Sequence, residues 1–250
     1  MVTPSFPPSF GGLERHVEQH ATAMQHTRCA VTVLTQMWDG TLTDAPTREV
    51  RPDGVEILRF RMPFGRKVFG FAPSLIAHLR RHQDDFDVVH LWSCQSSLAI
   101  ASAMVLTRPF VVTPVFPDRG ERSRTGVTHA GGRRLARRLF SGASTVVCGS
   151  PGEAVTLSAM FPEASAKIEI LAPEEAQGVG LTAHPVGEGA SSQEIADAPE
   201  AVLAQSDGPD RDGHTPPSAF FAERFLQIYR SVGGSETKDD DSRADDTLVP

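Results

Sequence analysis

The sequence predicts an α/β fold in which helices cover both faces of a Rossmann-like parallel sheet. Between residues 55 and 173, short runs rich in β-branched residues alternate with segments of helical periodicity. This alternation is typical of a doubly wound parallel sheet. Beyond residue 173 the periodicity stops and returns only near residue 216. We therefore expect one sheet domain over residues 1–173.

The chain opens with an extended segment that leads into a helix. Its prolines disfavour helix, and Gly11 and Gly12 end the extended run. Apolar residues then recur at spacings of four, four and three, as on one face of an amphipathic helix. These residues are Leu13, Val17, Ala21 and Met24. A strand is expected next, at 30–35.

The remaining elements are expected in alternation along the chain. The expected strands are 55–60, 86–91, 109–113, 144–148 and 167–171, and the expected helices are 72–82, 95–106, 132–140 and 151–160. The first strand is nearly absent, because only Met1, Val2 and Thr3 precede Pro4, and a strand usually has about five residues. Either the start codon is placed too late or the sheet lacks most of a central strand.

The last third of the chain differs in composition from the rest. Residues 174–215 hold nine acidic residues against Arg211 alone and show no apolar stripe, so we expect a disordered acidic linker. Helical spacing returns at 216–232, and 233–250 is expected to be a disordered acidic tail. The apolar positions of the helix are Phe221, Phe225, Ile228, Tyr229 and Val232.

Cysteine usage and hydropathy indicate the compartment. The three cysteines form no CxxC pair, which suits reduced thiols in a cytoplasmic protein. The longest apolar run, 98–106, is far shorter than a membrane span. No basic-then-apolar signal segment opens the chain.

The motif GGLERHV at 11–17, followed by AVTVLT at 30–35, resembles the start of the amino-terminal domain of family-4 glycosyltransferases of the GT-B fold. The resemblance extends to about residue 173. It implies transfer of a sugar from a nucleotide-diphosphate sugar to a hydroxyl acceptor, with neither a cofactor nor a metal.

Full-length members of that family also carry a second, donor-binding domain and a terminal helix that crosses back to the first domain. The helix at 216–232 resembles the terminal helix, and the acidic linker stands where the second domain would be. We therefore expect a truncated chain, whose activity on its own is in question. The alternative is a non-catalytic module that binds an acceptor or a membrane.

Candidate site residues lie where strands end, because ligands of doubly wound sheets bind beyond the carboxyl ends of the strands. Gly11 and Gly12 precede a helix whose free N–H groups suit an anion, and the resemblance implies that they approach the donor diphosphate. His90 is a candidate general base; the alternative is a buried histidine bonded to backbone. Arg119 and Ser150, in later loops, are candidate substrate-binding residues.

Two other sites depart from a catalytic or metal-binding pattern. Many relatives have T-P-H after the fifth expected strand, whereas this chain has Thr113, Pro114 and Val115, and valine accepts no proton. His16 and His20 lie one helical turn apart, but without a third ligand they are expected to face solvent. No metal site is expected.

Basic charge gathers in one segment, although the net charge of the chain is −7. Residues 119–138 hold seven arginines against Glu121 alone. The four on the expected helix are Arg133, Arg134, Arg137 and Arg138. Such a face can bind the inner membrane surface peripherally, or a phosphorylated lipid or glycan acceptor; the alternative is a core helix with a solvated arginine face. Nucleic acid is not an expected partner, because no aromatic residues are interleaved with the arginines.

Overall fold

The computed structural model describes residues 1–38, 47–63, 70, 72–115, 130–171 and 217–233. They form an eight-stranded sheet with the order β3-β4-β2-β1-β5-β6-β7-β8. Every neighbouring pair is parallel except β3 and β4, which are antiparallel at one edge. The predicted Rossmann-like α/β fold is confirmed, and the antiparallel edge strand is an addition that the sequence did not predict.

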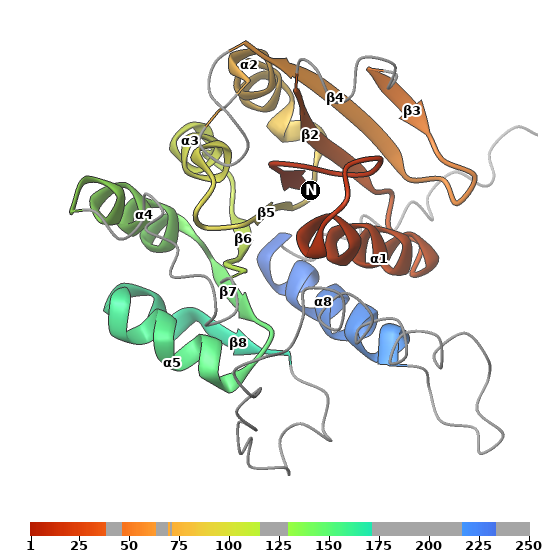
Figure 1. The fold of residues 1–250 in the computed structure, drawn as a ribbon. Coiled ribbons are helices and arrows are strands. Elements are labelled where there is room, and N and C mark those ends of the chain that lie inside the picture. The colour runs from red at the N-terminus through yellow and green to blue at the C-terminus, as the bar shows by residue number, and fades with distance from the viewer. Residues whose placement is uncertain (39–46, 64–69, 71, 116–129, 172–216, 234–250) are drawn as a thin grey trace, which may run out of the picture.

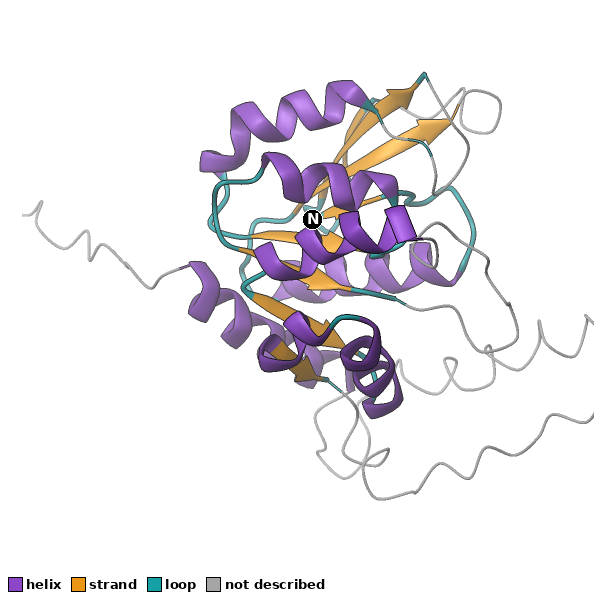
Figure 2. Cartoon of the chain, turned by 90° about the vertical axis from the view of Figure 1, so that its left-hand side faces the viewer, coloured by secondary structure: helices purple, strands orange, loops and turns teal. Residues whose placement is uncertain are grey.

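The strands and helices fall close to their predicted positions. The strands are β1 (Val2–Thr3), β2 (Thr32–Trp38), β3 (Arg48–Val50), β4 (Glu56–Met62), β5 (Val89–Trp92), β6 (Phe110–Thr113), β7 (Thr145–Cys148) and β8 (Ile168–Ile170). The α-helices are α1 (Gly12–His26), α2 (Pro73–His82), α3 (Ser97–Val105), α4 (Ala130–Gly142), α5 (Pro151–Met160) and α8 (Pro217–Gly233). Figure 2 shows the strands twisting between these helices.

The shortest strand, β1, lies at the centre of the sheet between β2 and β5. Val2 pairs with both Leu34 and Leu91, and the terminal ammonium of Met1 donates to the Thr32 carbonyl at 2.7 Å. Burial lowers the pKa of that ammonium to about 5. The first strand is therefore as short as expected, and of its two residues Val2 is paired on both sides and Thr3 with β2.

Each face of the sheet has its own helices and its own core. Helices α2, α3, α4 and α5 cover one face, where buried side chains such as Leu75, Leu98 and Leu139 form one apolar cluster. Helices α1 and α8 lie side by side on the other face (Figure 1), where Val17, Met24 and other buried side chains form a second cluster. The core thus lies on both sides of the strands, as the doubly wound prediction requires.

The segment after the last strand is described only in part. The helix expected at 216–232 is present as α8, and it packs back on α1. The predicted linker at 174–215 and the predicted tail beyond Gly233 lie outside the described residues. Over the described ranges, no helix is long and apolar enough to cross a membrane.

Candidate functional site

The chain reverses its direction across the sheet between β1 and β5. From β1 the strand order runs outward through β2 to β4, whereas β5 to β8 lie on the other side of β1. In open parallel sheets the crevice at such a switch point, beyond the carboxyl ends of the strands, is the usual ligand site. Here it lies between the loop after β1, at residues 4–11, and the loop after β5, at residues 93–96.

The loop after β1 is buried at its start and exposed at its end. Phe6 is 1% exposed, whereas Phe10 is 99% exposed. Gly11 is the N-cap residue of α1, has extended backbone angles and supplies no side-chain cap. At Gly12, a Cβ would have no neighbouring atom within 4 Å. The amino end of α1 therefore presents backbone N–H groups next to open space.

Two helices that follow other parallel strands, α3 and α5, have side-chain caps at their amino ends. Ser96 accepts a hydrogen bond from Leu98 N at the start of α3. Ser150 accepts one from Glu153 N at 3.1 Å, while the Glu153 carboxylate accepts one from Gly149 N at 2.8 Å. The predicted substrate-binding Ser150 therefore serves here as the cap of α5, and Glu153 in the first turn bonds the residue before it. Any contact of Ser150 with substrate stays a prediction.

A carboxylate stands beside the first glycine. The Ser5 hydroxyl donates to Glu14 Oε1, and this bond holds the Glu14 side chain against Gly11. An acidic residue in the first turn complements the partial positive charge of the helix end. Gly12 has no such neighbour, so the Glu14 carboxylate does not close the Gly12 side of the helix end.

The loops after β5 and β6 meet at the same edge in unusual backbone conformations. Ser93 has a φ of 69° and Val115 a φ of 50°, both in the left-handed region that residues with a Cβ seldom adopt. Ser93 N donates to Thr113 O at 3.0 Å, and Cys94 N donates to Pro114 O at 2.9 Å. Strained backbone of this kind gathers at binding and catalytic sites.

His90, the predicted general base, is fully buried in β5. Its Nε2 is hydrogen bonded to Thr113 Oγ1 at 2.8 Å and its Nδ1 to the Tyr229 hydroxyl at 2.6 Å. The same hydroxyl is hydrogen bonded to His20 Nε2 at 2.9 Å. The chain of groups His20, Tyr229, His90 and Thr113 therefore joins α1, α8, β5 and β6, and the partners of His90 are side chains rather than the backbone groups considered above.

The four groups satisfy one another in their neutral forms. His20 N–H can donate to Tyr229, Tyr229 O–H to His90, and His90 N–H to Thr113, or every bond can run in the opposite direction. Desolvation lowers the pKa of His20 to about 3 and that of His90 well below its ordinary value. Burial also raises the pKa of Tyr229. The catalytic role of His90 stays a prediction, since both ring nitrogens are engaged.

The two histidines of α1 differ in their surroundings. His20 is 8% exposed and packs edge-on against Phe225 at 4.1 Å between ring centroids, so the expectation that it faces solvent is wrong. His16 is exposed, as expected, and its ring lies 5.4 Å from that of Trp92. Within the described residues, no group of three His, Cys, Asp or Glu side chains could hold a metal ion.

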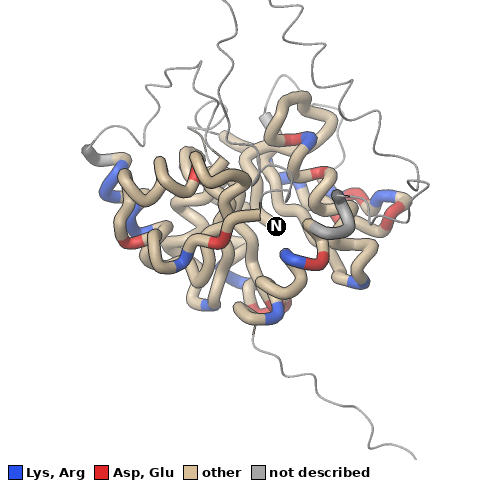
Figure 3. Tube along the Cα trace, turned by 90° about the horizontal axis from the view of Figure 1, so that it is seen from below, with Lys and Arg blue, Asp and Glu red and all other residues tan. Residues whose placement is uncertain are grey.

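The predicted cationic helix is present as α4. Its residues Ala136, Leu139 and Phe140 are buried, and all four predicted arginines of the helix are exposed. In Figure 3 several basic positions lie along this helix. Arg137 pairs with Glu163 at 3.7 Å. The binding of a membrane or a phosphate by these arginines stays a prediction, and Arg119 lies outside the described residues.

Two residues of this region were missed by the sequence reasoning. Tyr229 was read only as part of an apolar helix face, but its hydroxyl joins two histidines. Arg59 was not singled out, yet its guanidinium is buried and donates to the Pro7 carbonyl at 2.8 Å. A signal for Arg59 existed, because it lies two residues after the buried Ile57 and so on the same face of β4.

Comparison with known proteins identifies the family. The family model for glycosyltransferase family 4 matches residues 10–173, which include the glycine pair, α1 to α5 and β2 to β8. A search of the curated proteins finds no match. Among solved structures the chain is similar to sucrose-phosphate synthase from Thermosynechococcus elongatus, with 12% identity and a TM-score of 0.48 over 92% of this chain and 98% of that chain. Because the family model covers more than half of the sequence, the chain belongs to glycosyltransferase family 4.

Proposed function

We propose that this chain forms the acceptor-side half of a site that transfers a sugar from a nucleotide-diphosphate sugar to a hydroxyl acceptor. Family membership supports the reaction class. The observation that carries the proposal is the uncapped amino end of α1, with open space at Gly12, at the switch point between β1 and β5. Helices α3 and α5 each have a side-chain cap, whereas α2 also lacks one but begins with a proline, which has no N–H.

The chemistry follows from the position of the charge. When the sugar leaves its nucleotide, negative charge builds up on the diphosphate oxygens, and fixed N–H donors at a helix end stabilise it. The proposal gives this role to the N–H groups of Gly12 and Leu13. His90 stays the proposed base; because its Nε2 bonds Thr113 Oγ1, it would act on an acceptor hydroxyl through Thr113.

A valine at Gly12 tests the diphosphate site. The added atoms enter open space, so the variant folds like the parent but obstructs the N–H groups, and we expect uridine or guanosine diphosphate to bind about tenfold more weakly or worse. The matched control is Gly152→Val in the first turn of α5, where a Cβ also has room. Isothermal titration with each nucleotide is the measurement. Parental affinity in Gly12→Val would refute the proposed site.

The alternative function is a non-catalytic binding module. The observation that favours it is the exposure of the four arginines on α4, together with Leu135, which is 42% exposed between them. These side chains suit an anionic lipid surface or a phosphorylated acceptor. If the parent chain binds neither nucleoside diphosphate in the titration above, that result favours the non-catalytic binding module over the diphosphate site.

A further inference from the structure

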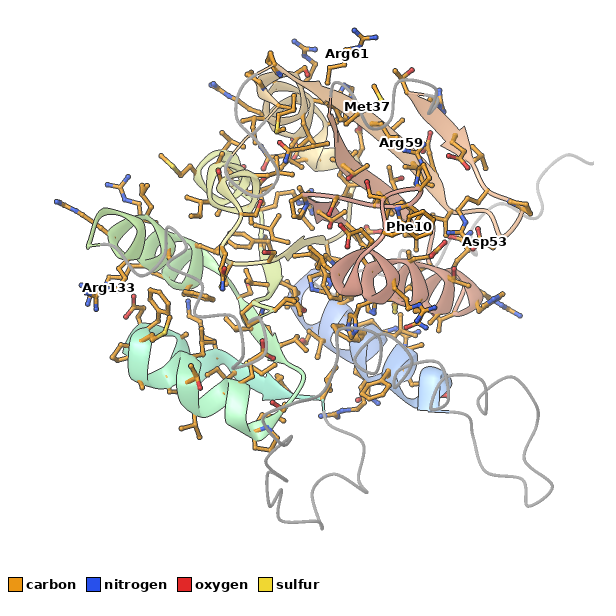
Figure 4. The ribbon with its side chains drawn as sticks, viewed as in Figure 1. Phe10, Met37, Asp53, Arg59, Arg61 and Arg133 are labelled. Carbon is orange, nitrogen blue, oxygen red and sulfur yellow. The ribbon has the colours of Figure 1, made fainter. Side chains whose placement is uncertain are left out.

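Arg59 is a buried cation on the face of the sheet that α1 and α8 cover. Its side chain is 2% exposed. The guanidinium donates through Nη1 to Glu49 Oε2 at 2.7 Å and through Nη2 to the Pro7 carbonyl at 2.8 Å. It therefore links three segments: β4, the edge strand β3, and the loop between β1 and α1. Figure 4 shows Arg59 on this side of β4, while Arg61 and Arg133 point away from the core.

A buried guanidinium contributes less to stability than an apolar side chain of similar size would. Removal of a charged group from water costs several kcal/mol, and the residue two positions earlier, Ile57, fills the same face with apolar atoms. The planar fork of arginine offers something that an apolar side chain cannot, which is two donors at a fixed angle. Here one donor has a carboxylate partner and the other holds a loop carbonyl.

The Pro7 carbonyl lies between the part of the loop that is bonded and buried and the part that is exposed. Upstream, Thr3 Oγ1 donates to Ser5 O at 2.9 Å, and Phe6 is buried in the core. Ser9 N then donates to Phe6 O at 3.2 Å and closes a turn around Pro7. Downstream, Phe10 is almost fully exposed and Gly12 has open space. The bond from Arg59 thus ties the last anchored stretch to the sheet.

We propose that Arg59 is a positioning residue, which sets the placement of Gly11 and Gly12 over the carboxyl edge of the sheet through its bond to Pro7. Its link to Glu49 makes the antiparallel strand β3 part of the same support. The consequence for ligand binding rests on the proposed diphosphate site, whereas the placement of the loop does not. The two parts are therefore tested by separate measurements.

The first measurement uses the ligand-free full chain. Arg59→Met keeps much of the side-chain length but removes both donors, and Arg61→Met is the matched control at an exposed position of the same strand. We expect the amide NMR signals of Gly11 and Gly12 to shift, and the Ser9 amide to exchange faster with solvent, in Arg59→Met but not in Arg61→Met. Unchanged glycine signals in a folded Arg59→Met variant would overturn the proposal.

A second variant covers the case in which Arg59→Met does not fold. Glu49→Gln keeps the guanidinium but weakens its hold, and Glu49 is partly exposed, so the fold tolerates the change. We expect glycine shifts in the same direction and smaller, and no such shifts would again overturn the proposal. Arg59→Lys, with a charge but no fork, is expected to restore the parental signals only in part.

The second measurement is titration with uridine or guanosine diphosphate. Arg59→Met is expected to bind about tenfold more weakly or worse, because the donors of α1 are displaced, and Arg61→Met to bind like the parent. Parental affinity in a variant whose glycine signals have moved would overturn the effect on ligand binding. If the parent itself binds neither nucleotide, the proposed function fails, while the glycine signals still decide whether Arg59 positions the loop.

Discussion

The two faces of the sheet are stabilised by different chemistry. The face under α2 to α5 is filled largely by aliphatic and aromatic side chains. The face under α1 and α8 also buries polar groups, and several of them are hydrogen bonded between elements far apart in the chain: they are His20, Arg59, His90 and Thr113. Non-directional packing suffices for the first face, whereas the second fixes particular orientations next to the candidate site.

The largest loss of stability is expected on the apolar face. Leu98 in α3 is fully buried in the cluster of that face, so Leu98→Ala leaves a cavity and should lower the free energy of unfolding by about 2 to 5 kcal/mol. Chemical denaturation followed by circular dichroism measures it. Met104→Ala, at an exposed position of the same helix, is the control, and a loss as large there would show that the helix rather than the core is responsible.

A smaller but more informative loss is expected from Tyr229→Phe. The ring stays in place, but His20 Nε2 and His90 Nδ1 lose their common partner, and buried unpaired polar groups cost about 1 to 3 kcal/mol each. Ser231→Ala is the matched control, because it removes a hydroxyl of α8 that bonds only the Ile228 carbonyl within the helix. Equal stability of the two variants, measured by denaturation, would contradict the role of this hydrogen-bonded chain.

The same contrast explains what the sequence could predict. The elements of the apolar face could be predicted from local patterns. Runs of β-branched residues predicted β5, β6 and β7, and helical spacing predicted α2, α4 and α5. Most of the predicted bounds lie within three residues of the observed ones. The short edge strand β3 was missed, because Arg48, Glu49 and Val50 are too few for a clear alternation.

The polar face depends on contacts that no local pattern reveals. His90 and Tyr229 are 139 residues apart, so their hydrogen bond has no signature in spacing. His20 did carry a signal, since it lies three residues after Val17 and four before Met24 on the buried stripe of α1. The expectation that a polar side chain faces solvent outweighed that spacing. At the candidate site, the glycine pair could be read from the sequence, but its support by Arg59 could not.

The smallest expected effect is a gradual change of stability with pH, which arises from the face under α1 and α8. His20 has a folded pKa of about 3, lowered mainly by desolvation and then by His16 and the terminal ammonium. The unfolded histidine titrates near its ordinary value of about 6.5. Between these two pH values the unfolded chain binds more protons than the folded chain, so this contribution to stability is complete above the upper value and is lost as pH falls toward the lower one.

Each such histidine gives a slope of about 1.4 kcal/mol per pH unit across that window. We therefore expect His20→Gln, whose amide can still bond Tyr229, to be less stable than the parent at pH 7 but to lose less stability between pH 6 and pH 4, by roughly one proton. Denaturation midpoints at several pH values measure the slope, with His26→Gln at an exposed position of the same helix as the control. If the dependence of stability on pH is unchanged in His20→Gln, then burial does not hold His20 neutral. The hydrogen-bonded groups on this face would then tolerate a charge.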